Sequence, residues 1–132
     1  MNPTIKQATA MRDAFDRIEE SYEYMLAYAA QGRKTDMEDT GGESQIRQFL
    51  RRFHGALDDL DGALEEGLGG PDGEAFAGRF RDNLSATRSV LAILLAKPAI
   101  SSDMVDNANG LITLRALLTD VFFTDQAVLP PR

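Results

Sequence analysis

The sequence predicts an all-α fold, a four-helix bundle with up-down-up-down connectivity. Four long segments carry apolar residues every three or four positions, which is the period of an amphipathic helix. Segments rich in glycine, proline or charge separate them and are typical of helix connections. A chain of 132 residues is long enough to bury one core, so we expect residues 1–132 to form a single helical-bundle domain.

The first predicted helix runs from Pro3 to about Ala30. Asn2 suits its N-cap, and proline at the first helical position loses no hydrogen bond. Residues 31–42 carry charge and a Gly-Gly pair without an apolar period, so they predict a long connecting loop. The apolar stripe of the first helix comprises Ala8, Met11, Phe15, Ile18, Tyr22, Met25 and Ala29.

The second predicted helix runs from about Glu43 to Leu68. Gly67, Gly69, Gly70 and Pro71 are stop signals at its C-terminal end. Its apolar stripe comprises Ile46, Phe49, Leu50, Phe53, Ala56, Leu57, Leu60, Ala63 and Leu64.

The third and fourth predicted helices span about 72–97 and about 103–124. Pro98 ends the third, and Ser101 or Ser102 can cap the fourth. Helix propensity is poor from Asn107 to Gly110, so the alternative to four continuous helices is a three-helix core with the fourth helix broken near Asn109-Gly110. The two prolines of the 126–132 tail predict an irregular end.

Composition narrows the function classes. The chain has no cysteine, which excludes thiol catalysis, thiolate metal sites and disulfides. Its longest apolar run, Val90 to Ala96, is far short of the ~20 residues of a membrane span, and no signal-peptide pattern precedes the first helix. We therefore expect a cytoplasmic protein that binds no membrane. The net charge of −7 would repel phosphate backbones, so we also expect no nucleic-acid partner.

The chain has a single histidine, which limits both metal binding and phosphoryl transfer. Carboxylate di-iron bundles need two Glu-x-x-His motifs, and zinc hydrolases need several histidines, so His54 alone predicts no metal site and no cofactor. A histidine phosphotransfer-like protein is a weaker alternative. Leu57 and Asp58 stand where that family has a lysine-like donor and a glycine, and the nearby acids would repel a phosphoryl group.

The predicted second helix presents an acidic, glycine-bearing face. Between Arg52 and Arg79 the chain has seven acids and neither lysine nor arginine. Two glycines inside the helix each cost roughly 0.5–1 kcal/mol relative to alanine, which favours a face that a basic partner protein approaches closely. The alternative is an ordinary solvated face. The candidate residues are Gly55, Asp58, Asp61, Gly62 and Glu65.

A second candidate surface lies where the first and third helices end. Both are apolar on nearly every side there, and in an up-down-up-down bundle these ends share one pole, so we expect the two apolar bands to sit together. Tyrosine is favoured at interfaces, which predicts a homodimer through Tyr24, Tyr28, Val90 and Ile93. The alternative is that the loop or the tail covers this pole.

Taken together, these patterns favour a non-enzymatic module that binds a partner protein through a helical surface, as an adaptor, a regulator or a chaperone-like protein. A helical bundle that binds a small apolar ligand is the alternative.

Overall fold

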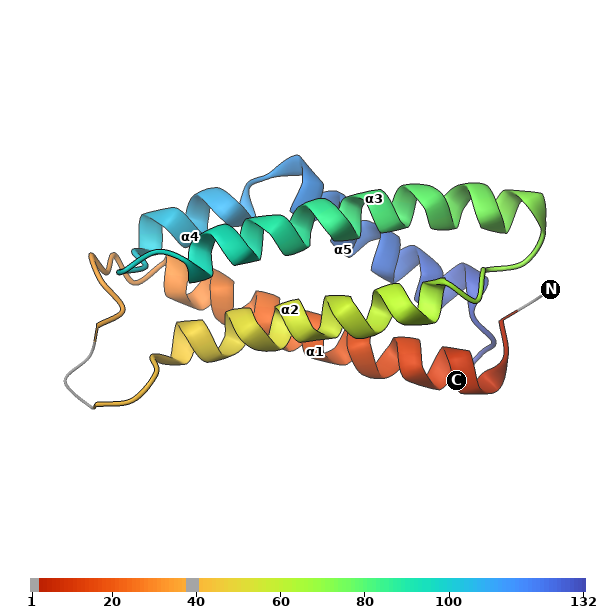
Figure 1. The fold of residues 1–132 in the computed structure, drawn as a ribbon, viewed down its shortest axis with the longest axis horizontal. Coiled ribbons are helices and arrows are strands. Elements are labelled where there is room, and N and C mark those ends of the chain that lie inside the picture. The colour runs from red at the N-terminus through yellow and green to blue at the C-terminus, as the bar shows by residue number, and fades with distance from the viewer. Residues whose placement is uncertain (1–2, 38–40) are drawn as a thin grey trace.

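The computed structural model describes residues 3–37 and 41–132, and within them the chain is all-helical with no β-strand. Five α-helices follow one another along the chain: α1 (Ile5–Ala29), α2 (Gln45–Leu64), α3 (Gly70–Leu95), α4 (Ser102–Asn109) and α5 (Ile112–Phe123). A short π-helix, η1 (Thr124–Val128), continues α5 (Figure 1). None of these helices is both long enough and apolar enough to cross a membrane.

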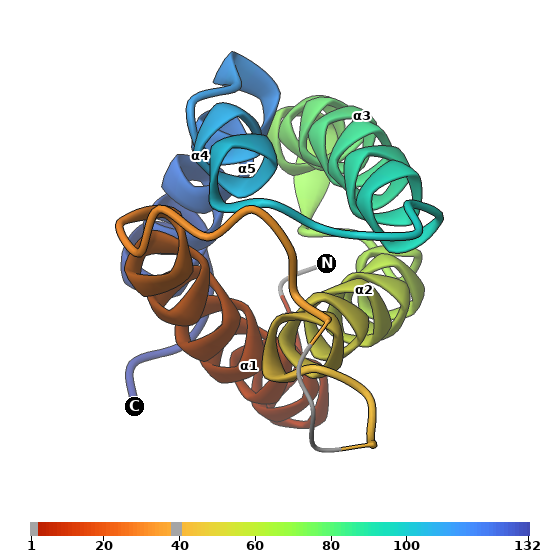
Figure 2. The same ribbon diagram turned by 90° about the vertical axis from the view of Figure 1, so that its left-hand side faces the viewer.

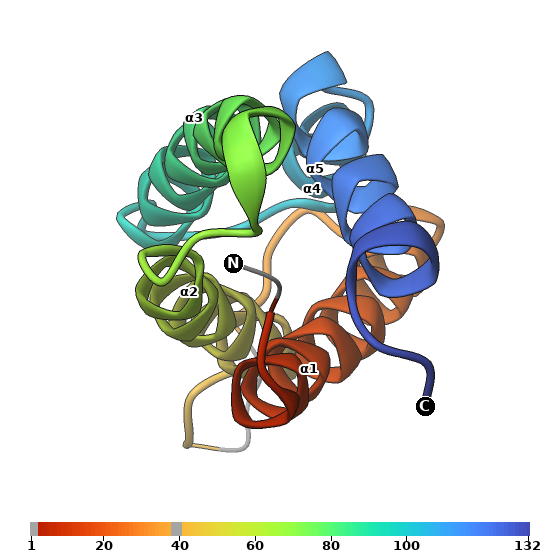
Figure 3. The same ribbon diagram turned by 90° about the vertical axis from the view of Figure 1, so that its right-hand side faces the viewer.

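The helices surround one central core. α1 packs against α2 and α4, and α3 packs against α2 and α5. Seen along the long axis, α1, α2 and α3 occupy three corners, and α4 followed by α5 lies between α1 and α3 (Figures 2 and 3). The prediction of four helices is therefore wrong by one, because the fourth segment forms two helices instead of one.

The break that the alternative placed in the fourth segment is present. α4 ends at Asn109, and the extended backbone of Leu111, at φ −65° and ψ 135°, separates it from α5. Asn109 is buried, and its side-chain amide donates a hydrogen bond to the Met25 carbonyl oxygen at 3.2 Å. This bond ties the end of α4 to α1, so the poor helix formers here fix a turn at a defined place.

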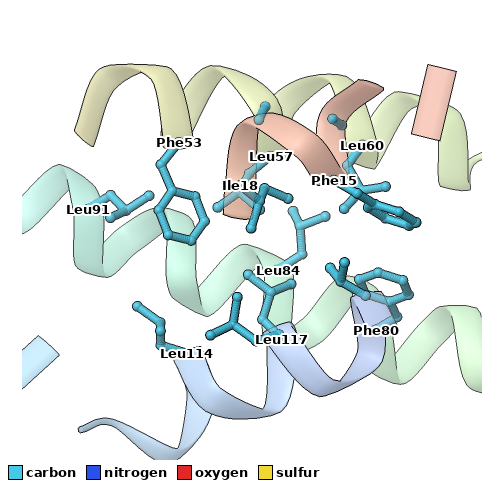
Figure 4. Packing of buried hydrophobic residues seen from close by; sticks show 14 of the residues in the cluster. Phe15, Ile18, Phe53, Leu57, Leu60, Phe80, Leu84, Leu91, Leu114 and Leu117 are labelled. Carbon is cyan, nitrogen blue, oxygen red and sulfur yellow. The ribbon is translucent and has the colours of Figure 1, made fainter. Parts of the chain in front are cut away.

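Apolar side chains from α1, α2, α3 and α5 interdigitate along the axis (Figure 4). The stripes predicted for the first two helices are largely the ones that become buried, and each fully buried large apolar side chain contributes about 1.5–3 kcal/mol. The labelled core residues are Phe15, Ile18, Phe53, Leu57, Leu60, Phe80, Leu84, Leu91, Leu114 and Leu117.

Serine and threonine side chains cap three of the helices. Thr4 caps α1, Ser44 caps α2 and Ser101 caps α4, each accepting a hydrogen bond from a backbone N–H three residues on. The first helix thus begins at Ile5 and not at Pro3, and the predicted cap, Asn2, lies outside the described residues.

The C-terminal tail packs on the bundle. Leu129 is buried, and the Arg12 Nε donates to Asp125 Oδ1 at 2.7 Å. The predicted irregular tail therefore starts later than expected, after η1 ends at Val128, and it is anchored on α1.

Candidate functional site

The acidic face of α2 is neutralised by arginines from other helices. Arg88 donates to Asp58 at 2.9 Å, and Arg81 donates to Asp61 at 2.9 Å and lies 3.6 Å from Glu65. The hydrogen bond to Asp61 is the main cause of a raised pKa of Arg81. The acidic residues predicted to attract a basic partner thus already form ion pairs with arginines of α3. A count of charges along the sequence could not predict these pairs, because the arginines belong to another helix.

The two glycines on this face have open space beside them. A Cβ atom added at Gly55 or at Gly62 would meet no other atom within 4 Å. Neither glycine is needed for a close approach within the chain. Both remain available to a partner, so their proposed role at an interface stays a prediction.

The two apolar bands expected to meet at one pole lie apart. α1 packs on α2 and α4 and not principally on α3, and the two helices sit at opposite corners in Figure 2. Tyr24 stacks on Phe49 of α2 with ring centroids 4.4 Å apart. Ile93 is 60% exposed on α3, and Val90 is half-buried. The four residues therefore do not form one continuous patch.

Tyr28 is fully buried, which corrects its assignment to a surface interface. Its hydroxyl donates to the Ile100 carbonyl oxygen at 2.6 Å, and its own carbonyl oxygen accepts from the Ser102 hydroxyl at 2.7 Å. The chain between α3 and α4 therefore covers the end of α1. This arrangement supports the alternative in which the protein's own connections close that pole.

A buried ion pair fastens the first loop to the same pole. Asp36 is only 1% exposed, and its carboxylate accepts hydrogen bonds from the Ser44 hydroxyl at 2.6 Å, the Arg47 Nε at 2.7 Å and the Ile100 N–H at 2.7 Å. Arg47 also donates to the carbonyl oxygens of Leu95 and Lys97, at 3.1 and 2.6 Å. The two residues therefore join the loop, α2 and the end of α3.

The hydrogen bonds of Asp36 outweigh the cost of burying its charge. Burial raises the pKa of this carboxyl, but the bonds from Ser44, the Ile100 N–H and Arg47 together lower it from 3.8 to about 2. The group is therefore ionised at neutral pH. Its role is structural, since its carboxylate accepts hydrogen bonds from Ser44, Arg47 and the Ile100 N–H of the same chain.

The opposite pole carries an open, mainly apolar cleft. It has a volume of about 480 Å³. Phe76 of α3 and Phe123 of α5 form two of its walls, with ring centroids 5.3 Å apart in an edge-to-face arrangement. Phe123 remains 54% exposed. We call it the polar-end cleft because it lies at one pole of the bundle. Its lining residues are Pro3, Leu68, Gly69, Asp72, Gly73, Phe76, Phe123, Ala127 and Val128.

Two features hold the walls of the polar-end cleft in place. Asp120 of α5 is buried and accepts hydrogen bonds from Arg79 at 2.5 Å and Asn83 at 2.9 Å, both on α3, which joins the two helices that carry Phe76 and Phe123. In the α2–α3 turn, a Cβ added at Gly73 would lie 2.8 Å from the backbone carbonyl of Leu68. A side chain at this position would clash with the Leu68 carbonyl, so the close contact between the start of α3 and the turn requires glycine at position 73.

One exposed acid, Asp72, lines the polar-end cleft, and the exposed acids Glu66 and Glu74 lie near it in the sequence but are not among the lining residues. Within the part of the chain that the structure describes, no ion pair joins any of the three to a lysine or arginine. They differ in this from Asp58, Asp61 and Glu65 on α2. Asp72 thus places one acidic side chain without a lysine or arginine partner in the lining of the cleft.

One signal in the sequence indicates this surface. Phe122 and Phe123 end the last predicted helix, where two adjacent large side chains cannot both face the core, and both are half exposed. The pairing of Phe123 with Phe76 depends on how α5 lies against α3, which periodicity does not specify.

Across residues 3–37 and 41–132, no group of three or more histidine, cysteine, aspartate or glutamate side chains is placed to hold a metal ion. Comparisons with protein-family models, with curated proteins and with solved structures find no match for this chain. The case for a function therefore rests on the geometry of these surfaces.

Proposed function

We propose that the protein is a non-enzymatic interaction module, an adaptor, regulator or chaperone-like protein, that binds a partner protein at the polar-end cleft. The scaffold would be an up-down-up-down arrangement in which α4 and α5 together replace the fourth helix. In this proposal the molecule works in the cytoplasm and needs no cofactor.

One observation carries the proposal: a mainly apolar cleft lies beside two half-exposed phenylalanines at one end of the bundle. Aromatic side chains around a recess are typical of binding surfaces, because they contribute large contact areas on desolvation. Asp72 adds a polar, charged group to the lining. The opposite pole, by contrast, is closed by Asp36, Arg47 and Tyr28.

Site-specific photo-crosslinking tests the proposal. Benzoylphenylalanine placed at Phe123 keeps an aromatic group at the cleft, and the same residue placed at Ser85, which is exposed on α3, is the matched control. In the cells that make this protein, we expect one reproducible protein adduct from position 123 and none from position 85. Equal labelling from the two positions, or no protein adduct from position 123, would overturn the proposal.

A small apolar ligand is the second candidate, because a volume of about 480 Å³ falls in the range of about 300–1,000 Å³ usual for ligand pockets. Native mass spectrometry of the purified protein separates the two functions. A bound small molecule that the Phe123→Ser substitution removes would favour this candidate over a protein partner.

A further inference from the structure

We infer that a groove at the junction of α4 and α5 binds a free α-amino acid with an apolar side chain, its ammonium group at the end of α4 and its carboxylate at the start of α5. The two helices meet at a bend on the outside of the bundle (Figure 1), and the groove between this bend and α1 has a volume of about 500 Å³. No residue lines both this groove and the polar-end cleft, so the inference goes beyond the proposed function.

Two charged side chains of the groove stand at the unfavourable ends of their helices. Asp106 lies in the last turn of α4, where the helix dipole is negative, and Arg115 closes the first turn of α5, where the dipole is positive. Within the described chain, neither side chain forms an ion pair or a hydrogen bond with the other or with any third residue. The groove therefore carries one negative and one positive site that the protein itself leaves uncompensated.

A buried amide adds an unused acceptor on the negative side. Asn109 ends α4, lines the groove and is only 7% exposed. Its Nδ2 donates to the Met25 carbonyl oxygen at 3.2 Å, and because a carbonyl oxygen can only accept, the other arm of the amide is the oxygen. That Oδ1 atom is buried and has no hydrogen-bond partner among the described residues. A buried acceptor without a partner is costly, so it points to a ligand that brings an N–H donor.

The start of α5 supplies the complementary donors. Its N-cap residue, Leu111, lines the groove and makes no side-chain hydrogen bond to the first turn. Backbone N–H groups at a helix start favour an anion, and with the Arg115 guanidinium they form a site for a carboxylate. An ammonium group at Asp106 and Asn109 and a carboxylate at Arg115 belong to one small zwitterion, because all three residues line one groove.

Apolar side chains beside these charges select among zwitterions. Leu26 of α1 is 47% exposed, Leu111 is 43% exposed, and both line the groove together with Tyr22. An aliphatic or aromatic side chain of the ligand would cover them and remove apolar surface from water. A residue inside a peptide chain has neither a free ammonium group nor a free carboxylate, which favours a free amino acid over a protein segment.

Isothermal titration calorimetry of the purified full chain tests the inference with L-leucine, L-methionine and L-phenylalanine, each at up to about 10 mM. We expect at least one of them to bind. The amide and the N-acetyl derivative of that amino acid each lack one charge, and glycine lacks the apolar side chain. All three should bind at least about tenfold more weakly.

Matched variants locate the binding. Asp106→Asn and Arg115→Gln should each weaken the amino acid about tenfold. Asp103→Asn and Lys6→Gln remove exposed charges outside the groove and should change binding less than about twofold. Because Asp106 and Arg115 oppose the dipoles of their helices, the melting temperature of the ligand-free protein should stay the same or rise in both groove variants.

Four results would overturn the inference. They are no binding of any of the three amino acids, equal binding of the amide or of the N-acetyl derivative, equal losses in the control variants, or a melting temperature that falls in either groove variant, which would make the charge structural. The proposed function fails separately, because crosslinking at position 123 does not involve this groove.

Discussion

Replacing Asp36 by asparagine should destabilise the protein in a pH-dependent way. The pKa of Asp36 falls from 3.8 to about 2 on folding, and a shift of this size corresponds to about 2 kcal/mol of stability at neutral pH. Because the folded-state pKa is the lower one, this stability is present above pH 3.8 and is lost as the pH falls through about 2.

The substitution also leaves Arg47 without its buried anionic partner. Breaking a buried pair by removing one charge usually costs more than the titration alone, so we expect Asp36→Asn to lose about 2–4 kcal/mol at neutral pH. Asparagine keeps an acceptor for the Ile100 N–H, so the loop can still close. The loss should shrink in acid, where wild-type Asp36 becomes protonated as well.

Urea denaturation followed by circular dichroism from neutral pH to about pH 2.5 measures the difference. Asp13→Asn is the control, because Asp13 is exposed and lies 3.7 Å from its partner Arg17, a pair worth about 0–1 kcal/mol. The reasoning is refuted if Asp36→Asn costs no more than the control. It is equally refuted if the difference from wild type does not fall with pH.

Three further outcomes follow from the helices. Gly55→Ala and Gly62→Ala should each stabilise the protein by about 0.5–1 kcal/mol in the same denaturation assay, since an added Cβ meets nothing; destabilisation by either would contradict the open space beside them. Gly73→Ala should instead lower the melting temperature, because its Cβ would press on the Leu68 carbonyl at 2.8 Å; an unchanged melting temperature would show that the turn can relax. For the homodimer predicted from the sequence, sedimentation at tens of micromolar should give a monomer mass, because Tyr28 is buried and the four residues form no continuous patch; a dimer mass that Ile93→Asp reduces to a monomer mass would contradict this expectation.

Local patterns in the sequence predicted the helices well. The three-and-four spacing identified α1, α2 and α3, and the weak helix formers from Asn107 to Gly110 marked the break between α4 and α5. These features depend on neighbours along the chain, so they can be read without knowing how the helices pack.

The surfaces were harder to predict because they depend on packing between distant residues. Arg81 and Arg88 neutralise α2 although they lie 20 and 30 residues from Asp61 and Asp58. The buried Tyr28 donates its hydroxyl hydrogen bond to a carbonyl oxygen 72 residues away. Likewise, the cleft exists because Phe76 meets Phe123, a pairing that no local spacing encodes.

The most direct test of the central claim is a ¹⁵N NMR titration of the full chain with the protein that crosslinks at position 123. We expect the largest shifts at Leu68, Gly69, Gly73, Phe76, Phe123 and Val128, which line the polar-end cleft, and small shifts around Ile93 and along the Asp58–Asp61 face of α2. The claim would be contradicted if the largest shifts fell on α2 or at the pole closed by Asp36, with the cleft residues unchanged.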